Sequence, residues 1–406
     1  MSRIFLTGPV RKQPKQVVSG AVARLVEKRA AVIDDKVARL RFMRRWIAAH
    51  EAATEHSQAA RHVLRRRVYL TAGISAVALL AVAAWVLREP GKPASRLLPG
   101  TVARQIAAAV ALPKVWLVER QAKIEIYSNG LRIDNEFLTS TRTRAYSAFD
   151  RMAWRESAVS TQPVGIVFHT TESGVAPFEP SQNSRLRRAG HNLLAYVAQR
   201  HLYHFVIDRF GRVFRVVAET DYANHAGQSI WADERNIYWG LNHSFLGIAF
   251  EAQTDGQSAD ANDTATRAQI DAARVLTEML RSKYGIAEIN CVTHAQVSVN
   301  PKTMRLGAHT DWAANFPFRE VGLPDGYLTP IAALTLFGFD YDSAFLQANG
   351  RHVWQGLVSA EEQLIRDAAA HGTTVENYRR GLRKKFQVWK ASQTQGLEEE
   401  GLADRG

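Results

Sequence analysis

Between residues 161 and 320, short apolar runs alternate with longer segments whose apolar residues recur at helical spacing. The runs VGIVFH (164–169) and SFLGIAFEAQ (244–253) have the length of buried strands, while residues 183–201 and 264–284 have the period of amphipathic helices. Strands that alternate with helices in this way form a sheet with helices packed on its faces. The pattern therefore predicts an α/β fold with a central mixed β-sheet flanked by helices.

Turn signals add further strands to this sheet. The segment YHFVIDRFGRVFRVV (203–217) indicates two strands joined at an Asp-Arg-Phe-Gly turn, and INCVTH (289–294) indicates a short strand. Upstream, Asn129-Gly130 stands between alternating runs and is a strong hairpin signal. We expect a β-rich lead-in over residues 119–160 that packs on the following domain.

An uncharged run of 19 residues, YLTAGISAVALLAVAAWVL, occupies positions 69–87. As a helix it would span roughly 28 Å, close to the thickness of a bilayer's hydrocarbon core. Tyr69 and Trp85 stand near its two ends, where interfacial aromatic residues are common. The run begins too far from the N-terminus to be a signal peptide. It predicts one transmembrane helix ahead of the α/β domain.

The positive charge of the chain is concentrated before this run. Residues 1–67 hold 16 Lys/Arg against 5 Asp/Glu, whereas the rest of the chain holds 36 against 34. The positive-inside rule therefore places residues 1–67 in the cytoplasm and the chain after the span outside it. This distribution argues against nucleic acid as a partner. It predicts a single-pass protein of the inner (cytoplasmic) membrane whose folded domain is periplasmic.

The remainder of the chain adds little chemistry. The lone Cys291 excludes an intrachain disulfide, and a Pro/Gly-punctuated linker starts at residue 88. Two helices are expected at 359–371 and 373–390, followed by a disordered end at 396–406. The predicted organisation is a basic cytoplasmic helical segment (1–67), a transmembrane helix (68–87), a linker (88–118), a β-rich lead-in (119–160), the α/β domain (161–325) and a helical C-terminal extension (326–406).

Candidate metal ligands follow the ends of the predicted strands. His169 closes the first apolar run, His294 follows INCVT, and Asp311 stands in the segment His309-Thr310-Asp311-Trp312. Two imidazoles and one carboxylate, with a fourth position left for water, form the ligand set of a catalytic zinc ion. A lone histidine at a strand end is more often structural, so the combination carries the prediction.

Several blocks together resemble the type-2 N-acetylmuramoyl-L-alanine amidases, relatives of peptidoglycan recognition proteins and phage amidases. The resemblance covers residues 164–318, roughly two-fifths of the chain. The matching blocks, in order, are IVFHTTES, YHFVIDRFGRVF, ANHAGQSIW with the following Asn242 and Ser244, LGIAFEAQ, Gln269, THAQVS and HTDWAANFPF. The family implies a mixed sheet, one Zn²⁺ ion, and cleavage of the amide between N-acetylmuramic acid and L-alanine of peptidoglycan stem peptides.

The resemblance also assigns roles by position. It implies that His169, His294 and Asp311 are the zinc ligands. Tyr203 matches a tyrosine that hydrogen-bonds the attacking water or the developing oxyanion. His225, with Asn224 beside it, matches a histidine that lines the substrate cleft.

The chain departs from the family at the position of the general base. Many members have Gly-Ile-Glu-Leu, whereas this chain has Gly-Ile-Ala249-Phe-Glu251. Residues two apart on a strand share a face, so Glu251 would lie ~6.6–6.8 Å farther along the same cleft. We predict that Glu251 is the base; the alternative is a polar residue at a strand end.

A second departure is His309, which stands where the family often has a lysine. As a histidinium it would stabilise the oxyanion, or it could pass a proton to the leaving amine. In another register His309 is itself the third zinc ligand and Asp311 its hydrogen-bond partner. The spacing to Asn-Phe-Pro-Phe favours Asp311.

Two functions follow from these residues. The first is a membrane-anchored zinc amidase that acts on peptidoglycan or muropeptides. The alternative is a non-catalytic peptidoglycan sensor or scaffold, which the loss of Glu at position 249 suggests. The three predicted ligands and Tyr203 favour the enzyme.

Overall fold

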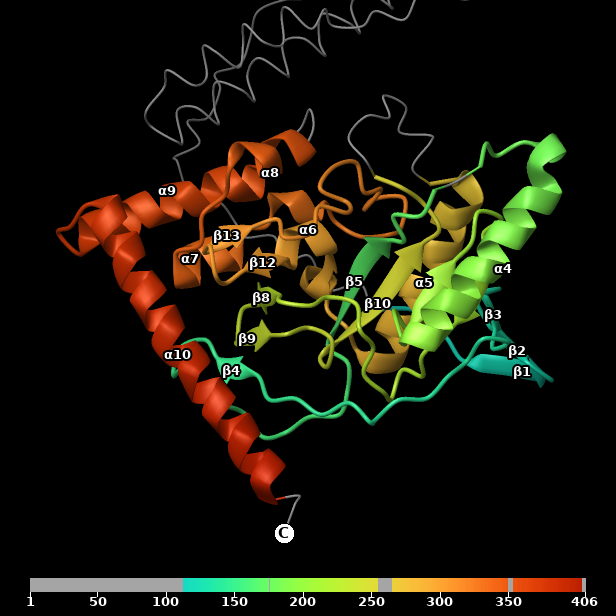
Figure 1. Cartoon of the computed structure of the whole chain (residues 1–406), viewed down its shortest axis with the longest axis horizontal. Helices are drawn as coiled ribbons and strands as arrows, with labels where there is room; N and C mark the ends of the chain where they lie inside the picture. Colours follow the sequence, from blue (N-terminus) through green and yellow to red (C-terminus); the bar gives the residue numbers. More distant parts are fainter. Residues whose placement is uncertain (1–111, 175, 255–264, 350–352, 404–406) are drawn as a thin grey trace, which may run out of the picture.

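The computed structural model describes residues 112–403, apart from residues 175, 255–264 and 350–352 (Figure 1). The described part is organised around a mixed sheet of eight strands. In spatial order these are β1 (Leu117–Gln121), β2 (Ile124–Tyr127), β3 (Arg132–Asp134), β7 (Val213–Arg215), β6 (Phe205–Ile207), β10 (Phe245–Phe250), β5 (Gly165–Thr170) and β11 (Cys291–Thr293). The predicted mixed sheet with flanking helices is confirmed.

The strands that carry or precede the predicted histidine ligands belong to the parallel part of this sheet. β10 lies between β6 and β5, and β11 pairs with the other edge of β5, all in parallel. Every residue of β5 and β10 is buried. Burial on both faces explains why these strands are continuous apolar runs rather than alternating ones. The register places Ala249 of β10 beside His169 of β5.

The lead-in extends the same sheet. β2 and β3 form the predicted antiparallel hairpin around Asn129-Gly130, where Gly130 has φ +84°. The side-chain amide of Asn129 donates a hydrogen bond of 2.9 Å to the carbonyl of Val275, which lies in the helix α5 (Arg267–Tyr284). β3 then pairs in parallel with β7. The hairpin therefore belongs to the main sheet and is tied to its helical layer.

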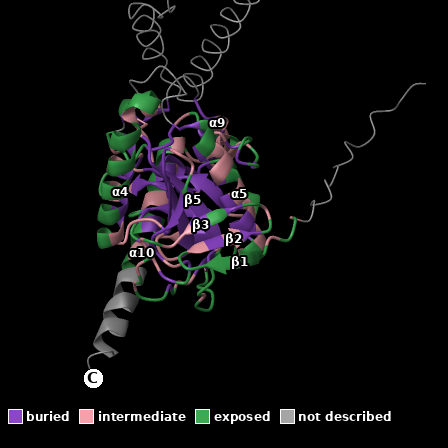
Figure 2. Ribbon diagram, turned by 90° about the vertical axis from the view of Figure 1, so that its right-hand side faces the viewer, coloured by how far each residue is buried: buried purple, intermediate pink, exposed green. Residues whose placement is uncertain are grey.

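Two long helices cover opposite faces of the sheet. α4 (Asn183–Arg200) buries Leu194 and Val197 against Ala249, whereas α5 (Arg267–Tyr284) buries Leu276 in the cluster that contains Phe168. Both helices lie close to their predicted ranges. A capping box between Thr266 and Gln269 starts α5 and satisfies two of its free backbone N–H groups. Figure 2 shows the buried strands enclosed between these helices, with the outer side of α4 exposed.

Smaller elements continue the fold beyond the sheet. They are the strands β4 (Phe149–Asp150), β9 (Asn236–Trp239) and β8 (Ile230–Ala232) in one sheet, β12 (Val299–Asn300) and β13 (Arg305–Leu306) in another, the helix α6 (His294–Val297), and the 3₁₀ turns η1 (Pro180–Gln182), η3 (Glu288–Asn290) and η4 (Gly326–Leu328).

Four helices form the C-terminal part: α7 (Ala332–Phe337), α8 (Ser343–Ala348), α9 (Gln355–Ala370) and α10 (Val375–Ala403). Phe337, Phe386 and Trp389 from these helices pack in one cluster with Phe149 and Ile237 of the small sheet. α9 and α10 correspond to the two predicted helices. The helix α10 continues to Ala403, through most of the end that we expected to be disordered. The extension therefore shares an apolar core with the domain that precedes it.

The predictions for the N-terminal part of the chain concern three segments. The basic segment 1–67, the membrane span 68–87 and most of the linker 88–118 lie outside the described residues. Within residues 112–403, as far as they are described, no helix has both the length and the apolar character needed to cross a membrane.

Candidate active site and metal centre

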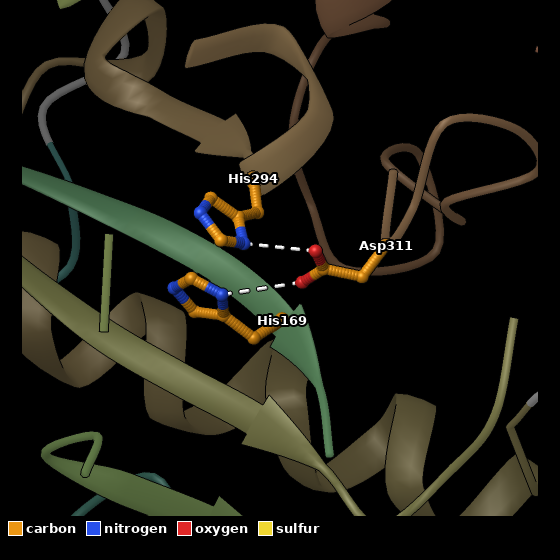
Figure 3. Close-up of side chains that lie close together, drawn as sticks. All are labelled: His169, His294 and Asp311. Carbon is orange, nitrogen blue, oxygen red and sulfur yellow. Dashed lines mark hydrogen bonds and ion pairs between the residues drawn. The ribbon is translucent and has the colours of Figure 1, made fainter. Parts of the chain in front are cut away.

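The predicted ligands meet at one edge of the parallel sheet. His169 stands near the carboxyl end of β5, and His294 directly follows β11, which pairs with β5. Because neighbouring parallel strands end on the same side, these two imidazoles come together. Asp311 reaches them from the loop after β13 (Figure 3). Strand topology thus supplies two ligands, and one loop supplies the third.

The three side chains converge closely. Asp311 Oδ1 lies 2.8 Å from His294 Nδ1, and Asp311 Oδ2 lies 3.2 Å from His169 Nδ1. One candidate ligand atom from each residue lies within 4.8 Å of the other two, and all three side chains are buried. Among the described residues, this group satisfies the geometry expected for a metal site. The structure thus brings together the three ligands that the resemblance implied.

Local hydrogen bonds fix where these residues point. Thr293 and Gln296 form a capping box that starts α6 at His294. The backbone N–H of Ala295 donates to the carbonyl of Asp311 at 3.3 Å. The indole N–H of Trp312 donates to the carbonyl of His169 at 3.0 Å. The loop that carries Asp311 is therefore held to β5 and to α6, the two elements that carry the histidines.

The charges of the group suit a divalent cation. Burial, followed by the nearby His294, lowers the pKa of His169 to about 4, so its imidazole is neutral at neutral pH. Burial alone would raise the pKa of Asp311, but His294 and His169 together hold it below its usual value. Neutral imidazole nitrogens and an ionised carboxylate are the donors that zinc prefers. The residues present therefore fit the implied metal.

His309 lies beside the group rather than within it. Its ring stacks on that of His294, with centroids 4.7 Å apart and an angle of 17°. Burial, followed by the nearby His294, lowers the pKa of His309, although Asp311 acts in the opposite direction. A neutral imidazole does not supply the positive charge predicted for this position, but its N–H can still donate. The geometry favours Asp311 over His309 as the third ligand.

Tyr203 approaches the group from the end of α4. Its backbone adopts φ +53°, and its ring centroid lies 5.1 Å from that of His169. Burial, followed by the negative charge of Asp311, raises the pKa of Tyr203. The hydroxyl therefore stays protonated at neutral pH and is available as a hydrogen-bond donor. Its role on the oxyanion stays a prediction.

His225 and Asn224 have different environments. His225 is 8% exposed, and its Nδ1 lies 3.1 Å from Nε2 of His169, behind the predicted metal ligand. Asn224 is exposed, and its backbone N–H donates to the carbonyl of His201 at 2.9 Å. Contact of either residue with substrate stays a prediction.

Glu251 lies on the predicted face but turns toward other partners. Its carboxylate accepts a hydrogen bond of 3.1 Å from the backbone N–H of Arg209. An ideal Cβ at Gly190 of α4 would lie 3.2 Å from Glu251 Oε2, so this glycine leaves room for the carboxylate. Burial raises the pKa of Glu251 to about 7. Its use as the general base stays a prediction, because these contacts face α4 and not the three ligands.

A cavity of about 450 Å³ opens beside His309. Asn300, Lys302 and Lys390 also line it, so the long helix α10 contributes to a wall next to the metal group. We missed this contribution because Lys390 is separated from the ligands by a long stretch of chain. The pattern of the C-terminal segment carries no signal for it.

Comparisons with known proteins agree with the motifs. Residues 160–311 match the family model described as N-acetylmuramoyl-L-alanine amidase. No curated protein matches the chain. The matched segment contains His169 and His294 and ends on Asp311.

Solved structures with similarity to the chain include three amidases or their relatives. AmiD from E. coli, solved with the substrate anhydro-N-acetylmuramic acid-L-Ala-D-gamma-Glu-L-Lys, is 19% identical over 61% of this chain and 98% of its own, with a TM-score of 0.32. AmpDh3 from Pseudomonas aeruginosa is 18% identical over 54% and 98%, with a TM-score of 0.33. The amidase LysC from Clostridium intestinale URNW is 20% identical over 45% and 93%, with a TM-score of 0.23.

At these identities and TM-scores the assignment rests on the family model together with the geometry of the site. Residues 160–311 therefore form an amidase domain of the N-acetylmuramoyl-L-alanine amidase family.

Proposed function

We propose that the chain is a zinc-dependent N-acetylmuramoyl-L-alanine amidase, which hydrolyses the amide between N-acetylmuramic acid and L-alanine of peptidoglycan stem peptides. The observation that carries this proposal is the buried group of His169, His294 and Asp311 inside the segment that matches the family. Zinc held there would polarise the amide carbonyl and lower the pKa of a water molecule. The chemistry is one that a two-histidine, one-carboxylate site performs in other zinc hydrolases.

Residues around the group have the properties that amide hydrolysis requires. Tyr203 offers a protonated hydroxyl next to His169 and would stabilise negative charge on the carbonyl oxygen. His309 stacks on His294 and lines the cavity; as a neutral imidazole it would first accept the proton that the attacking water gives up and then pass it to the leaving amine. Lys302 and Lys390 line the same cavity and would favour the carboxylates of an acidic stem peptide.

The position of the general base distinguishes this chain from many relatives. Many relatives carry a glutamate at the position of Ala249, which stands beside His169. In this chain the carboxylate belongs to Glu251, which is two residues farther along the chain and lies against α4. Glu251 would have to rotate away from the N–H of Arg209 to take a proton at the metal. This observation supports the second candidate function, a peptidoglycan-binding sensor that does not cleave its ligand.

Release of stem peptide separates the two functions. The purified chain is incubated with muropeptides, and free peptides are measured by mass spectrometry with and without a chelator and added zinc. The enzyme predicts release that a chelator abolishes and zinc restores, and no release by Asp311→Ala. Asp271→Ala is the matched control, because Asp271 is an exposed partner of Arg267. A zinc-loaded chain that binds muropeptide without cleaving it would favour the sensor.

We also propose that the amidase domain is anchored in the inner membrane and faces the cell wall. The uncharged run at 69–87 and the excess of Lys/Arg at 1–67 support this proposal. Such an anchor would keep the site beside its polymeric substrate. A reporter fused after residue 100 tests the topology: activity of a cytoplasm-specific reporter at that position would contradict it.

A further inference from the structure

We propose that the C-terminal helix α10 completes a specificity subsite beside the metal group, in which Lys390 and Lys302 bind a free carboxylate of the stem peptide. The subsite is the cavity of about 450 Å³ that His309 also lines. This role rests on the proposed function, because it concerns the peptide that the amidase would release. The chain should then distinguish a stem peptide with a free carboxylate from the same peptide with a carboxamide.

The cavity begins next to the metal group. The ring of His309 stacks on that of His294, with centroids 4.7 Å apart. The backbone N–H of His309 donates to Ser298 Oγ at 2.9 Å, which holds His309 at the base of the hairpin of β12 and β13. The volume of the cavity falls within the range of small-ligand sites, roughly 300–1,000 Å³. A substrate whose amide lies at the metal can therefore extend into it.

Two lysines from distant parts of the chain line this cavity. Lys302 lies in the turn between β12 and β13, and Lys390 lies on α10. Asn300 Oδ1 accepts hydrogen bonds from the backbone N–H groups of Lys302 and Thr303, at 3.0 and 3.3 Å, which fixes the turn. None of the described residues that line the cavity is acidic. Ammonium groups only donate hydrogen bonds, so the pair favours an anion with several acceptor atoms, such as a carboxylate.

The two elements that carry these lysines pack against each other. Met304, from the β12–β13 turn, is buried in one apolar cluster with Phe386 and Trp389 of α10. Gln387 Nε2 on the same helix donates to Met304 Sδ at 3.7 Å. Lys390 follows Trp389 directly, so the packing of α10 sets its position at the cavity. Lys390 also lies outside residues 160–311, which match the amidase family, so this contribution is additional to the family segment.

The negative charge of the proposed substrate lies on the peptide and not on the sugar. The lactyl carboxyl of N-acetylmuramic acid is consumed by the amide bond and carries no charge. The peptide keeps a carboxylate at its C-terminus and at any acidic residue whose carboxyl is free. Charge complementarity with Lys302 and Lys390 therefore places the peptide rather than the sugar in this cavity.

A carboxamide cannot replace the carboxylate in such a subsite. It has no charge, and its nitrogen is a donor that meets the donors of an ammonium group. Val299, Pro301 and Ala308 form an apolar part of the lining, where attraction between charges is less screened than in bulk water. One charge-assisted hydrogen bond from the half-buried Lys390 corresponds to about tenfold in affinity. Lys302 is exposed, so its contribution should be only about two- to fivefold.

Matched substrates test this subsite on the full chain. Three soluble muropeptides carry an acidic residue after L-alanine and differ only in charge. One keeps every carboxylate, one is amidated at the free carboxyl of that acidic residue, and one is amidated at the peptide C-terminus. We expect kcat/KM to be about tenfold lower for one of the two amides, chiefly through KM. The amide that is cleaved less well identifies the carboxylate that binds.

Four variants assign this preference to the lysines. Lys390→Gln should lower kcat/KM about tenfold on the free-carboxylate substrate and leave the poorly cleaved amide unchanged, so that the preference disappears. Lys302→Gln should reduce the preference by about two- to fivefold. Lys390→Arg keeps the charge and should keep the preference. Lys384→Gln is the matched control, because Lys384 is an exposed residue of α10 that is not among the described residues lining the cavity.

The outcomes also separate this subsite from the function on which it rests. Equal kcat/KM on all three substrates, or an equal loss on every substrate in Lys390→Gln, would overturn the subsite while the proposed amidase stands. An effect of Lys384→Gln as large as that of Lys390→Gln would overturn it as well. If no substrate is cleaved, the proposed function fails, and calorimetric titration with the free and amidated peptides decides the subsite. A preference for the carboxylate that Lys390→Gln removes supports it, whereas equal affinities overturn it.

Discussion

The indole N–H of Trp312 donates a 3.0 Å hydrogen bond to the carbonyl oxygen of His169, so the residue after the third predicted ligand is bound to the residue that supplies the first. Trp312 is 1% exposed and packs against Phe250 and Phe316. The Asp311 loop is thus fixed by an interaction that does not involve the metal. The arrangement holds the carboxylate close to both histidines before a metal binds.

Trp312→Phe removes this hydrogen bond but keeps an aromatic ring in the core. We expect a loss of about 1–3 kcal/mol in the free energy of unfolding, because the His169 carbonyl is left unsatisfied. Zinc affinity should fall as well, by up to about tenfold, because the loop becomes less well positioned. Trp231→Phe is the matched control, since Trp231 is equally buried and donates to Asn290 instead. Equal effects of the two variants on zinc affinity would contradict the prediction.

Glu251→Gln tests whether this carboxylate serves catalysis or only occupies the space under α4. Burial raises the pKa of Glu251 to about 7 from its ordinary value of 4.5. The folded state then binds a proton that the unfolded state has released, so stability is greatest below pH 4.5 and falls as pH rises to about 7. At about 1.4 kcal/mol per pKa unit, ionisation of the buried Glu251 carboxyl lowers the free energy of unfolding by about 3 kcal/mol above pH 7.

The amide has no such penalty and can still accept from Arg209. Glu251→Gln should therefore raise the melting temperature at pH 8 and leave it nearly unchanged at pH 4.5, as thermal unfolding measures. Its turnover decides the catalytic role. A fall of 100-fold or more would support the base, whereas near-native turnover would mean that the base is elsewhere.

Tyr203→Phe should lower kcat with little effect on folding. The ring that packs near His169 is kept, and only the hydroxyl is lost. Removal of one oxyanion donor typically lowers kcat by about 10²–10³. Steady-state kinetics on a soluble muropeptide would measure the change, with zinc content as the control. A change confined to KM would mean that Tyr203 binds substrate without stabilising the oxyanion.

The buried ion pair between Glu361 and Arg379 joins α9 to α10, with oxygen–nitrogen distances of 3.0 and 2.9 Å. Both side chains are almost fully buried. Glu361→Ala leaves an unpaired buried cation and should cost about 3–5 kcal/mol, as chemical denaturation measures. Glu376→Ala, which removes the exposed partner of Arg380, should cost at most about 1 kcal/mol. Comparable losses in the two variants would show that burial of the first pair is unimportant.

The parallel strands and two of the ligands could be predicted because their signals are local. β5, β10 and β11 are apolar runs, and residues that follow parallel strands meet at one edge of a sheet. Alternation along β10 also correctly predicted that Ala249 and Glu251 share a face. It could not predict that the carboxylate of Glu251 would lie against Gly190 and accept a hydrogen bond from the N–H of Arg209, because both of these residues come from other elements.

Other features depend on contacts between distant segments. The motif around His225 indicated that this residue lies near the site, but whether its ring lies in front of or behind His169 depends on the space above Gly247. Lys390 reaches the cavity only because aromatic residues of α10 pack on the small sheet. The helical period of that segment predicted the helix but not the surface to which it docks.

The loop after Asp311 is also bound to the C-terminal part of the chain. The indole N–H of Trp354, just before α9, donates to the Ala313 carbonyl at 2.8 Å, and the Tyr327 hydroxyl donates to the Trp312 carbonyl at 2.7 Å. Zinc binding at Asp311 and the packing of the segment before α9 are therefore thermodynamically coupled through this loop, and the coupling is reciprocal. Zinc should slow amide hydrogen exchange at the start of α9, and loosening α9 should weaken zinc binding by the same free energy. The C-terminal extension would then control, from a distance, how tightly the metal is held.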